Sequence, residues 1–390
     1  MRRPTLGFQG PLLVMFSLLV SQNVSPQPKR ASNSNNSAGT PILWRNPGNV
    51  SSRNLFYGPG SPKLAPVAPF TFIKEKKSGE SPKFVVRDAR GEQWTVKLGP
   101  EAQAETVSTR LVWAVGYFAE EAYYFDEVPI NGLPALSRGR DYVTGEIVQG
   151  ARFEPERATM ISGSSWDWRK NPFDDTRELS GLKVLMILLN NFDARSGNNR
   201  IIYANGARGR EARYYVTDLG ATLGRAGGLG GTRTKNDLAD FLSTKFVRGV
   251  DERDGVVEFD YDTRPKGLGN LSVLQPFYYR SQVNKEKAMR GIPVAHARWI
   301  GSLLNQLSDQ QFRDAFRAAG YSDSVQDSYV AALRERINQL SHLGSGLTGR
   351  RQHSERMAEK VAQFNSRAVK QVRTNVVNAF SKVGSMVKGN

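Results

Sequence analysis

The sequence predicts an α+β protein in which a small antiparallel β part precedes a larger, mostly helical part. Between residues 70 and 98, short runs of β-branched and aromatic residues alternate with turn residues, which is typical of antiparallel strands. Residues 182–189 form a leucine-rich apolar run that is too long for an exposed loop, and apolar residues recur at helical spacing between residues 293 and 343. At 390 residues, the chain can hold one two-lobed domain or two small domains.

The composition favours anionic partners and excludes thiol chemistry. The chain has a formal net charge of +17, which favours nucleotides, acidic proteins, polyphosphate or membrane surfaces, although the same charge also serves general solubility. It has no cysteine, so disulfides and thiolate metal sites are excluded. Its three histidines do not follow the spacing of metal ligands.

The first 65 residues predict a leader and a linker. Arg2 and Arg3 precede the apolar run 10–20, which predicts a signal peptide or short apolar leader over residues 1–22. Such a leader directs a protein for export, so we expect an exported protein, periplasmic or extracellular. The run is too short to span a bilayer, although the leader could still associate the protein with a membrane. A wrongly assigned start or a frayed apolar tail is the alternative. Residues 23–65 are rich in Asn, Ser, Pro and Gly, which predicts a disordered linker. Its exceptions, which are expected to dock on the folded body, are Trp44, Leu55, Phe56 and Tyr57.

Residues 66–149 are predicted to form the β part. Three strands are expected at residues 70–73, 83–86 and 93–98, and strands in this order make a meander. The first turn contains Gly79 and Ser81, at the position where a loop covering phosphates would lie. A single glycine in a turn is also compatible with an ordinary turn.

A lysine and two glutamates mark the end of the third strand. Lys97 lies at that end, and Pro100 begins a helix that carries Glu101 and Glu105. A lysine on a strand that is paired with a glutamate on a helix can hold nucleotide phosphates. Either glutamate could point inward, and we prefer Glu105 because it lies deeper in the helix. The alternative is two solvated acids that stabilise a helix N-terminus.

Residues 150–343 are predicted to form the larger helical part. Residues 142–148 are expected to cross from one part to the other, with Gly150 allowing a bend. An irregular or β-ribbon insert is expected over residues 249–275. Helices are expected over residues 293–307 and 308–343, and Gly320 should break the second of them.

Residues 179–224 carry the residues best suited to chemistry, and they are interpreted as helix, catalytic loop, hairpin and metal loop. Asp193 is followed five positions later by Asn198, and Asp218 precedes Leu-Gly at the end of a strand. Phosphoryl transfer needs one carboxylate to orient the attacking hydroxyl, and an amide and a second carboxylate to hold magnesium on the phosphates. Asn199 is an alternative to Asn198, because the Asn pair leaves the register open by one residue.

Taken together, five residues resemble the catalytic set of the protein-kinase-like superfamily. Lys97, Glu105, Asp193, Asn198 and Asp218 occur in the chain order of that superfamily. The resemblance covers residues 70–340 and implies a two-lobed kinase-like fold, with a small antiparallel β lobe and a larger, mostly helical lobe. It implies ATP and Mg²⁺ as cofactors, with the lysine on the phosphates and the glutamate paired with it. Asp193 would be the base, and the amide and last acid would bind magnesium.

The chain departs from that pattern in two respects. Asn191 and Phe192 stand where the superfamily has His-Arg, and a full glycine-rich loop is missing. Both departures resemble the divergent branch, which includes HipA-type, phosphoinositide and secretory-pathway kinases. The implied function is transfer of the γ-phosphate of ATP to a hydroxyl of a protein or a small molecule. The alternative is an exported pseudokinase or scaffold on the same fold, because nucleotide triphosphate is expected to be scarce outside the cytoplasm.

The C-terminal residues 344–390 are predicted to form a basic amphipathic helical tail. Residues 350–390 contain nine Lys or Arg against two Glu, which is a net charge of +7. Such a helix can lie on an anionic membrane or bind an acidic partner, and packing back on the domain is an equally good alternative. Binding to nucleic acid is not expected, because no recognised base-reading motif accompanies the charge.

Overall fold

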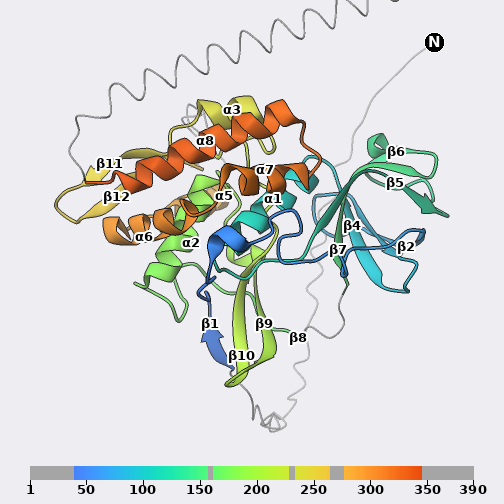
Figure 1. The fold of residues 1–390 in the computed structure, drawn as a ribbon, viewed down its shortest axis with the longest axis horizontal. Coiled ribbons are helices and arrows are strands. Elements are labelled where there is room, and N and C mark those ends of the chain that lie inside the picture. Colours follow the sequence, from blue (N-terminus) through green and yellow to red (C-terminus); the bar gives the residue numbers. More distant parts are fainter. Residues whose placement is uncertain (1–38, 157–160, 228–232, 264–275, 345–390) are drawn as a thin grey trace, which may run out of the picture. The chain divides into compact units, whose positions relative to one another are not determined.

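A computed structural model describes residues 39–156, 161–227, 233–263 and 276–344 (Figure 1). These residues belong to one structural unit, which spans Ala38–Asn390. The predicted leader and the predicted basic tail from residue 345 onward lie outside the described residues, as does the first part of the predicted linker. Among the described residues, no helix has the length and apolar character needed to cross a lipid bilayer.

The β part is a closed barrel with one additional short strand. Its strands are β2 (Phe70–Lys76), β3 (Lys83–Arg87), β4 (Gln93–Leu98), β5 (Tyr123–Asn131), β6 (Val143–Thr144) and β7 (Ile147–Pro155). The sheet order is β4-β3-β2-β5-β7-β6, and an additional β4–β7 pairing closes five of the strands into a ring. The predicted meander of β2, β3 and β4 is therefore present, but it is part of a barrel.

Barrel closure gives β4 a hydrogen-bonded neighbour on each side. Lys97 pairs with Lys83 of β3 and with Arg152 of β7. Side chains fill the interior, as expected for a barrel of this size. The buried core residues are Phe70, Phe84, Val86, Trp94, Val96, Leu98, Tyr123, Val128, Ile130, Leu136, Val148, Ala151 and Phe153. The strand that carries Lys97 is therefore held from both sides and from within.

The predicted crossover at residues 142–148 is wrong. β6 and β7 form a hairpin inside the β part, with Val143 paired with Val148. Gly145 adopts a φ of 62° in the tight turn, where a residue without a Cβ is favoured, and it sends the chain back. The predicted boundary at 149/150 consequently falls inside β7. The chain leaves the barrel only after Pro155.

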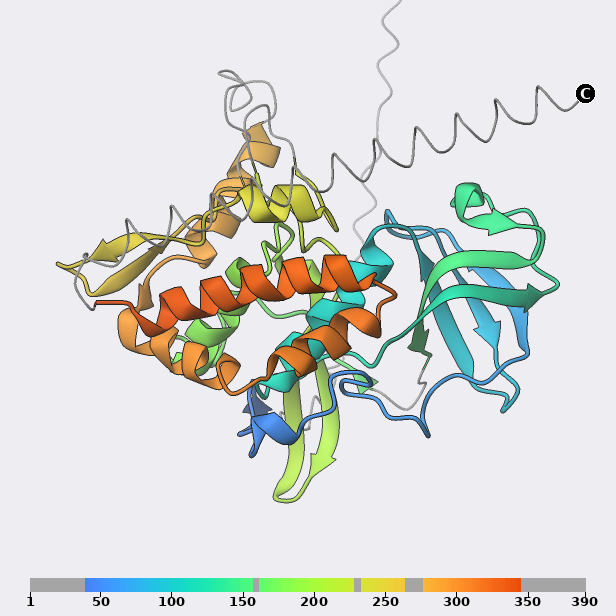
Figure 2. The ribbon, with the colours of Figure 1, turned by 45° about the horizontal axis from the view of Figure 1, so that its top comes forward.

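The remaining described elements form the helical part (Figures 1 and 2). The helices are α1 (Glu101–Ala114), α2 (Arg177–Leu188), α3 (Leu238–Ser243), α5 (Pro276–Ala288), α6 (Val294–Leu304), α7 (Asp309–Arg317) and α8 (Asp323–Ser341). Its short 3-10 helices are η1 (Val50–Ser52) and η3 (Ser196–Asn198), whereas η2 (Arg140–Tyr142) lies in the β part beside β6 and β7. The strands are β1 (Thr40–Ile42), β8 (Ile161–Ser162), β9 (Asn199–Gly206), β10 (Gly209–Val216), β11 (Val247–Asp251), β12 (Val256–Phe259) and β13 (Ile292–Pro293). These strands form two sheets, with the orders β1-β10-β9-β8 and β11-β12-β13.

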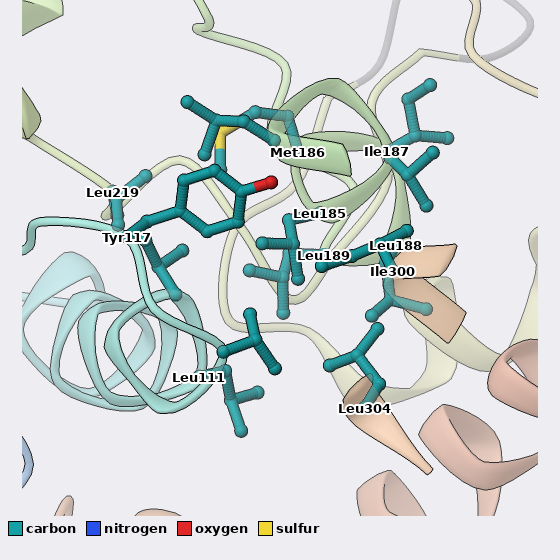
Figure 3. Close-up of a cluster of buried hydrophobic side chains, with 14 of the residues drawn as sticks. Leu111, Tyr117, Leu185, Met186, Ile187, Leu188, Leu189, Leu219, Ile300 and Leu304 are labelled. Carbon is teal, nitrogen blue, oxygen red and sulfur yellow. The ribbon is translucent and has the colours of Figure 1, made fainter. Parts of the chain in front are cut away.

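Helix α2 is the centre of the second hydrophobic core. It is apolar on nearly all sides, which is the pattern of a buried helix. Figure 3 shows Leu185 of α2 gathered with Leu111 of α1 and Leu304 of α6 in this core. Gly181 allows close packing, because an added Cβ would lie 2.7 Å from the Trp299 ring. The predicted break near Gly320 is confirmed, since α7 ends at Arg317 and α8 begins at Asp323.

The prediction of a disordered linker is wrong for residues 39–65. β1 pairs in parallel with β10, and the side chains of Leu43, Val50 and Leu55 are buried in the helical core. The Trp44 Nε1 donates a hydrogen bond of 2.6 Å to the Val115 carbonyl. Widely spaced apolar residues within a polar sequence supply these contacts, so the average composition of the segment concealed them.

Candidate active site

Lys97 and Glu105 form a buried ion pair between the barrel and α1. The Lys97 Nζ lies 2.9 Å from the Glu105 Oε2, and their side chains are 11% and 2% exposed. Glu101 lies one turn earlier on the same helix, and its Oε2 is 2.8 Å from the same Nζ. Lys97 thus reaches both glutamates, and the preferred Glu105 is the deeper of the two. A second cation, Arg152, lies 3.5 Å from the Glu105 Oε1.

Asp218 brings the predicted metal loop to the same lysine. Its Oδ1 lies 2.8 Å from the Lys97 Nζ, and its side chain is 46% exposed. The next residue, Leu219, is fully buried in the helical core. Asp218 has a φ of 55°, a backbone conformation that few residues other than glycine adopt, and aspartate tolerates it better than most. The loop therefore anchors its apolar side chain and presents the carboxylate to solvent.

Gly220 allows this loop to pack directly against α1. A Cβ added at Gly220 would lie 2.6 Å from the Cβ of Glu101, a contact that requires the helix or the loop to move. We expect Gly220→Ala to displace Asp218 and to destabilise the fold by ~1–3 kcal/mol, as overpacking typically does. Urea unfolding measures the change, and Gly197→Ala is the matched control, because nothing lies within 4 Å of a Cβ at that position. Equal stability of the two variants would contradict the proposed close contact.

The charges around Lys97 keep Lys97 and Glu101 ionised. Burial alone lowers the pKa of Lys97, but Glu105, Asp218 and Glu101 outweigh it, and the net pKa lies above its ordinary value. Burial raises the pKa of Glu101, but Lys97 and a hydrogen bond from Lys235 outweigh it and lower that pKa to about 2. Lys97 is therefore an ammonium and Glu101 a carboxylate at any physiological pH.

Asp193 follows α2 and is held by three side chains. The Asn198 Nδ2 donates to its Oδ2 at 2.9 Å, and the Arg195 Nε lies 3.1 Å from the same oxygen. The Lys285 Nζ lies 2.8 Å from its Oδ1. Burial lowers the pKa of Lys285, although Asp193 acts in the opposite direction. The carboxylate is 24% exposed, so it is oriented by these groups and still open to solvent.

Buried polar side chains support the loop that carries Asp193. The Asn191 Oδ1 accepts a bond of 2.9 Å from the Asp193 amide, and the Tyr261 hydroxyl donates to the Asn191 carbonyl. The Arg336 NH1 donates a hydrogen bond of 3.3 Å to the Oδ1 of Asn190, the residue before Asn191. A buried amide, a tyrosine and an arginine thus support this loop.

Asn198, rather than Asn199, faces the loop. The Nδ2 of Asn198 also donates to the Asp193 carbonyl at 2.9 Å. Asn199 is fully buried, and its Nδ2 donates to the Trp166 carbonyl at 2.9 Å, so its amide belongs to the packing beneath the loop. The Asn198 carbonyl accepts from the Thr217 amide at 2.8 Å. That bond places the Asp193–Asn198 pair beside the residue preceding Asp218.

The donor set fits magnesium. An amide oxygen from Asn198 and a half-exposed carboxylate from Asp218 are hard oxygen donors, and Mg²⁺ in nucleotide sites commonly takes one or two such ligands together with phosphate oxygens. Within the described residues, no group of three or more His, Cys, Asp and Glu side chains is arranged to hold a metal by itself. A metal held by these two residues would therefore need further ligands from a bound molecule or from water.

The turn between β2 and β3 reaches the same site through Ser81. The Ser81 Oγ donates a hydrogen bond to the Glu101 Oε2. Gly79 has a φ of 78° and its carbonyl accepts from the Arg138 NH1 at 2.6 Å, so this turn is tied down by Arg138. Ser81 thus lies at the predicted phosphate end of the site, whereas Gly79 contributes turn geometry.

Sequence reasoning missed two lysines at the site. Lys235 pairs with the Glu101 Oε1, and Lys285 pairs with Asp193. Neither lysine belongs to a recognisable sequence motif, and each lies more than 90 residues away in sequence from the acid that it pairs with. Only the three-dimensional fold brings them to the acids.

Comparisons with known proteins add little to this geometry. No protein-family model and no curated protein matches the sequence. One solved structure, described as "Crystal structure of A Helicobacter pylori proinflammatory kinase CtkA", aligns with 70% of this chain and 95% of its own length. The sequence identity is 14% and the TM-score is 0.34. A TM-score this low does not establish a shared fold.

Proposed function

We propose that this chain is an ATP-dependent phosphotransferase with a two-lobed, kinase-like architecture. The proposal rests on the ion pairs of Lys97 with Glu105 and Asp218. A backbone hydrogen bond between Asn198 and Thr217, the residue before Asp218, links this group to the Asp193–Asn198 pair. A cation, two carboxylates and an amide are the groups that phosphoryl transfer requires, and the barrel and the helical core each supply part of them.

Each residue has one role in the proposed reaction. Lys97 binds phosphate oxygens of ATP, and Glu105 orients it. Asp193 orients the acceptor hydroxyl and takes up its proton as the hydroxyl oxygen bonds to the γ-phosphorus. The bond from the γ-phosphorus to the bridging oxygen breaks, and ADP leaves with that oxygen. Asn198 and Asp218 would hold Mg²⁺, which offsets negative charge on the phosphate oxygens when it is bound.

Incubation of the full chain with labelled ATP and magnesium tests the proposal. We expect self-labelling or ATP consumption, and Asp193→Asn should lower that rate by about 100- to 10,000-fold, the usual contribution of a general base. Asp327→Asn is the matched control, because this exposed acid on α8 pairs with Arg313 at the surface. A rate that is the same in both variants would exclude Asp193 from the reaction.

A scaffold or pseudokinase is the second candidate, and one observation favours it. Two central groups of the site already have several protein partners, since Lys97 contacts three carboxylates and Asp193 contacts two cations. Thermal unfolding with and without ATP and magnesium separates the candidates. A ligand at about 100 times its dissociation constant stabilises a protein by ~2.7 kcal/mol. No shift at millimolar nucleotide would favour the scaffold.

A further inference from the structure

Three elements converge on one carboxylate of the candidate site. The Glu101 Oε2 lies 2.8 Å from the Lys97 Nζ on β4. Its Oε1 pairs with the Lys235 Nζ, from the segment between β10 and α3. The Ser81 Oγ, from the β2–β3 turn, donates to the same carboxylate. Glu101 therefore lies in a cradle of two ammonium groups and one hydroxyl.

This cradle has the chemistry of a phosphate site. Ammonium groups and hydroxyls are donors that bind phosphate oxygens through charge-assisted hydrogen bonds. The Lys97 ammonium has three N–H donors, and Glu101, Glu105 and Asp218 lie within 2.9 Å of it. A phosphate can bind Lys97 only if one carboxylate withdraws. Glu105 is the most deeply buried and is also close to Arg152, and Asp218 holds the metal in the proposed function. Glu101 is therefore the carboxylate whose withdrawal leaves both the Lys97–Glu105 pair and the metal ligand in place.

We propose that Glu101 is an internal competitor that occupies a phosphate position, and that Lys235 and Ser81 are further phosphate-binding groups of this site. The inference deepens the proposed function and rests on it for the identity of the ligand as a nucleoside triphosphate. The free protein is thereby held in a state of reduced nucleotide affinity. Displacement of Glu101 transfers both lysines to the phosphates.

The surroundings of Lys235 suit this exchange. Its side chain is 35% exposed, so incoming phosphates can reach it. The next residue is fixed independently, since the Asn236 amide donates to the Thr222 carbonyl at 2.9 Å and its Nδ2 donates to the Gln103 Oε1 at 3.0 Å. The backbone of Lys235 is therefore held in place by contacts that do not involve Glu101.

Two substitutions with opposite expected signs test the inference. Calorimetric titration of the full chain with MgATP should show that Glu101→Gln tightens binding by about tenfold, because one charge-assisted contact no longer has to be broken. In the Glu101→Gln background, adding Lys235→Met should weaken binding by about tenfold, because a phosphate contact is lost. If Lys235 only holds Glu101 in place, its removal from that background changes nothing, and that result overturns the inference.

Two controls separate this inference from the proposed function. Lys245→Met removes an exposed lysine of the same charge and should leave MgATP binding unchanged. Inorganic tripolyphosphate, measured by thermal shift, probes the cradle without a nucleoside. Stabilisation by tripolyphosphate that depends on Lys235, without binding of MgATP, would support the cradle and contradict the nucleotide function. Absence of any response to tripolyphosphate and MgATP in the Glu101→Gln variant would overturn the inference.

Discussion

Asp218→Ala is expected to abolish detectable binding of magnesium nucleotide. Its carboxylate is the half-exposed ligand of the expected metal site and lies 2.8 Å from the Lys97 Nζ. Loss of supporting groups at metal sites already costs about 10- to 100-fold in affinity, and loss of a direct ligand should exceed that. Calorimetric titration with MgATP provides the measurement, and the fold should be retained because Lys97 keeps its two glutamates.

The matched control is Asp327→Ala on α8. Asp327 pairs with Arg313, and both side chains are exposed, so its loss should cost under ~1 kcal/mol and leave the nucleotide affinity unchanged. Unfolding temperatures of both variants should lie close to that of the parent protein. Unchanged nucleotide affinity in Asp218→Ala would decide against the site.

Arg336→Met is expected to produce the largest loss of stability. Arg336 is buried on α8, and its guanidinium donates to the Leu188 carbonyl at 2.6 Å, to the Phe241 carbonyl at 3.0 Å and to the Thr244 Oγ1 at 2.7 Å. Burial lowers the pKa of Arg336 to about 9, so the group stays charged at neutral pH. Its removal leaves the buried Leu188 carbonyl without this donor and takes one of the donors from the Phe241 carbonyl and from the Thr244 Oγ1. We expect the loss of these charge-assisted bonds to cost ~3–5 kcal/mol.

Urea unfolding measures this loss, with Arg313→Met as the control. Arg313 is exposed and its pair with Asp327 is a surface contact, so we expect a change below ~1 kcal/mol. Because Arg336 also contacts Asn190 at the start of the catalytic loop, ATP turnover should fall further than stability alone accounts for. Equal unfolding free energies for the two variants would contradict a supporting role for Arg336.

Local signals in the sequence predicted most of the element positions. Strand alternation located β2, β3 and β4, and helix caps located the later helices, as the Ser308 capping box at the start of α7 illustrates. Lys97, Glu105 and Asp218 were predicted to meet, and in the structure Lys97 contacts both carboxylates. The expectation for Asp218 came from the resemblance in residue types and chain order and not from local spacing, since this residue lies 121 positions after Lys97.

The errors concern pairing between distant segments. Closure of the barrel depends on β4 pairing with β7, more than 50 residues later, and no local pattern encodes that choice. Four of residues 142–148 are β-branched, and the segment suits a hairpin strand and a crossover equally well. Only the barrel decides between them. Lys235 and Lys285 were not predicted, because a single lysine outside any motif cannot be assigned a partner from the sequence.

The docking of residues 39–65 limits how far the protein can be shortened from its N-terminus. Deletion to residue 66 would remove the side chains of Leu43, Val50 and Leu55, each of which contributes ~1.5–3 kcal/mol when fully buried. The Gln311 side chain would also lose the carbonyls of Val50 and Arg53, to which it donates. Since whole domains are stable by only ~5–15 kcal/mol, trimmed versions for crystallisation or limited proteolysis should retain the chain from Gly39 onward.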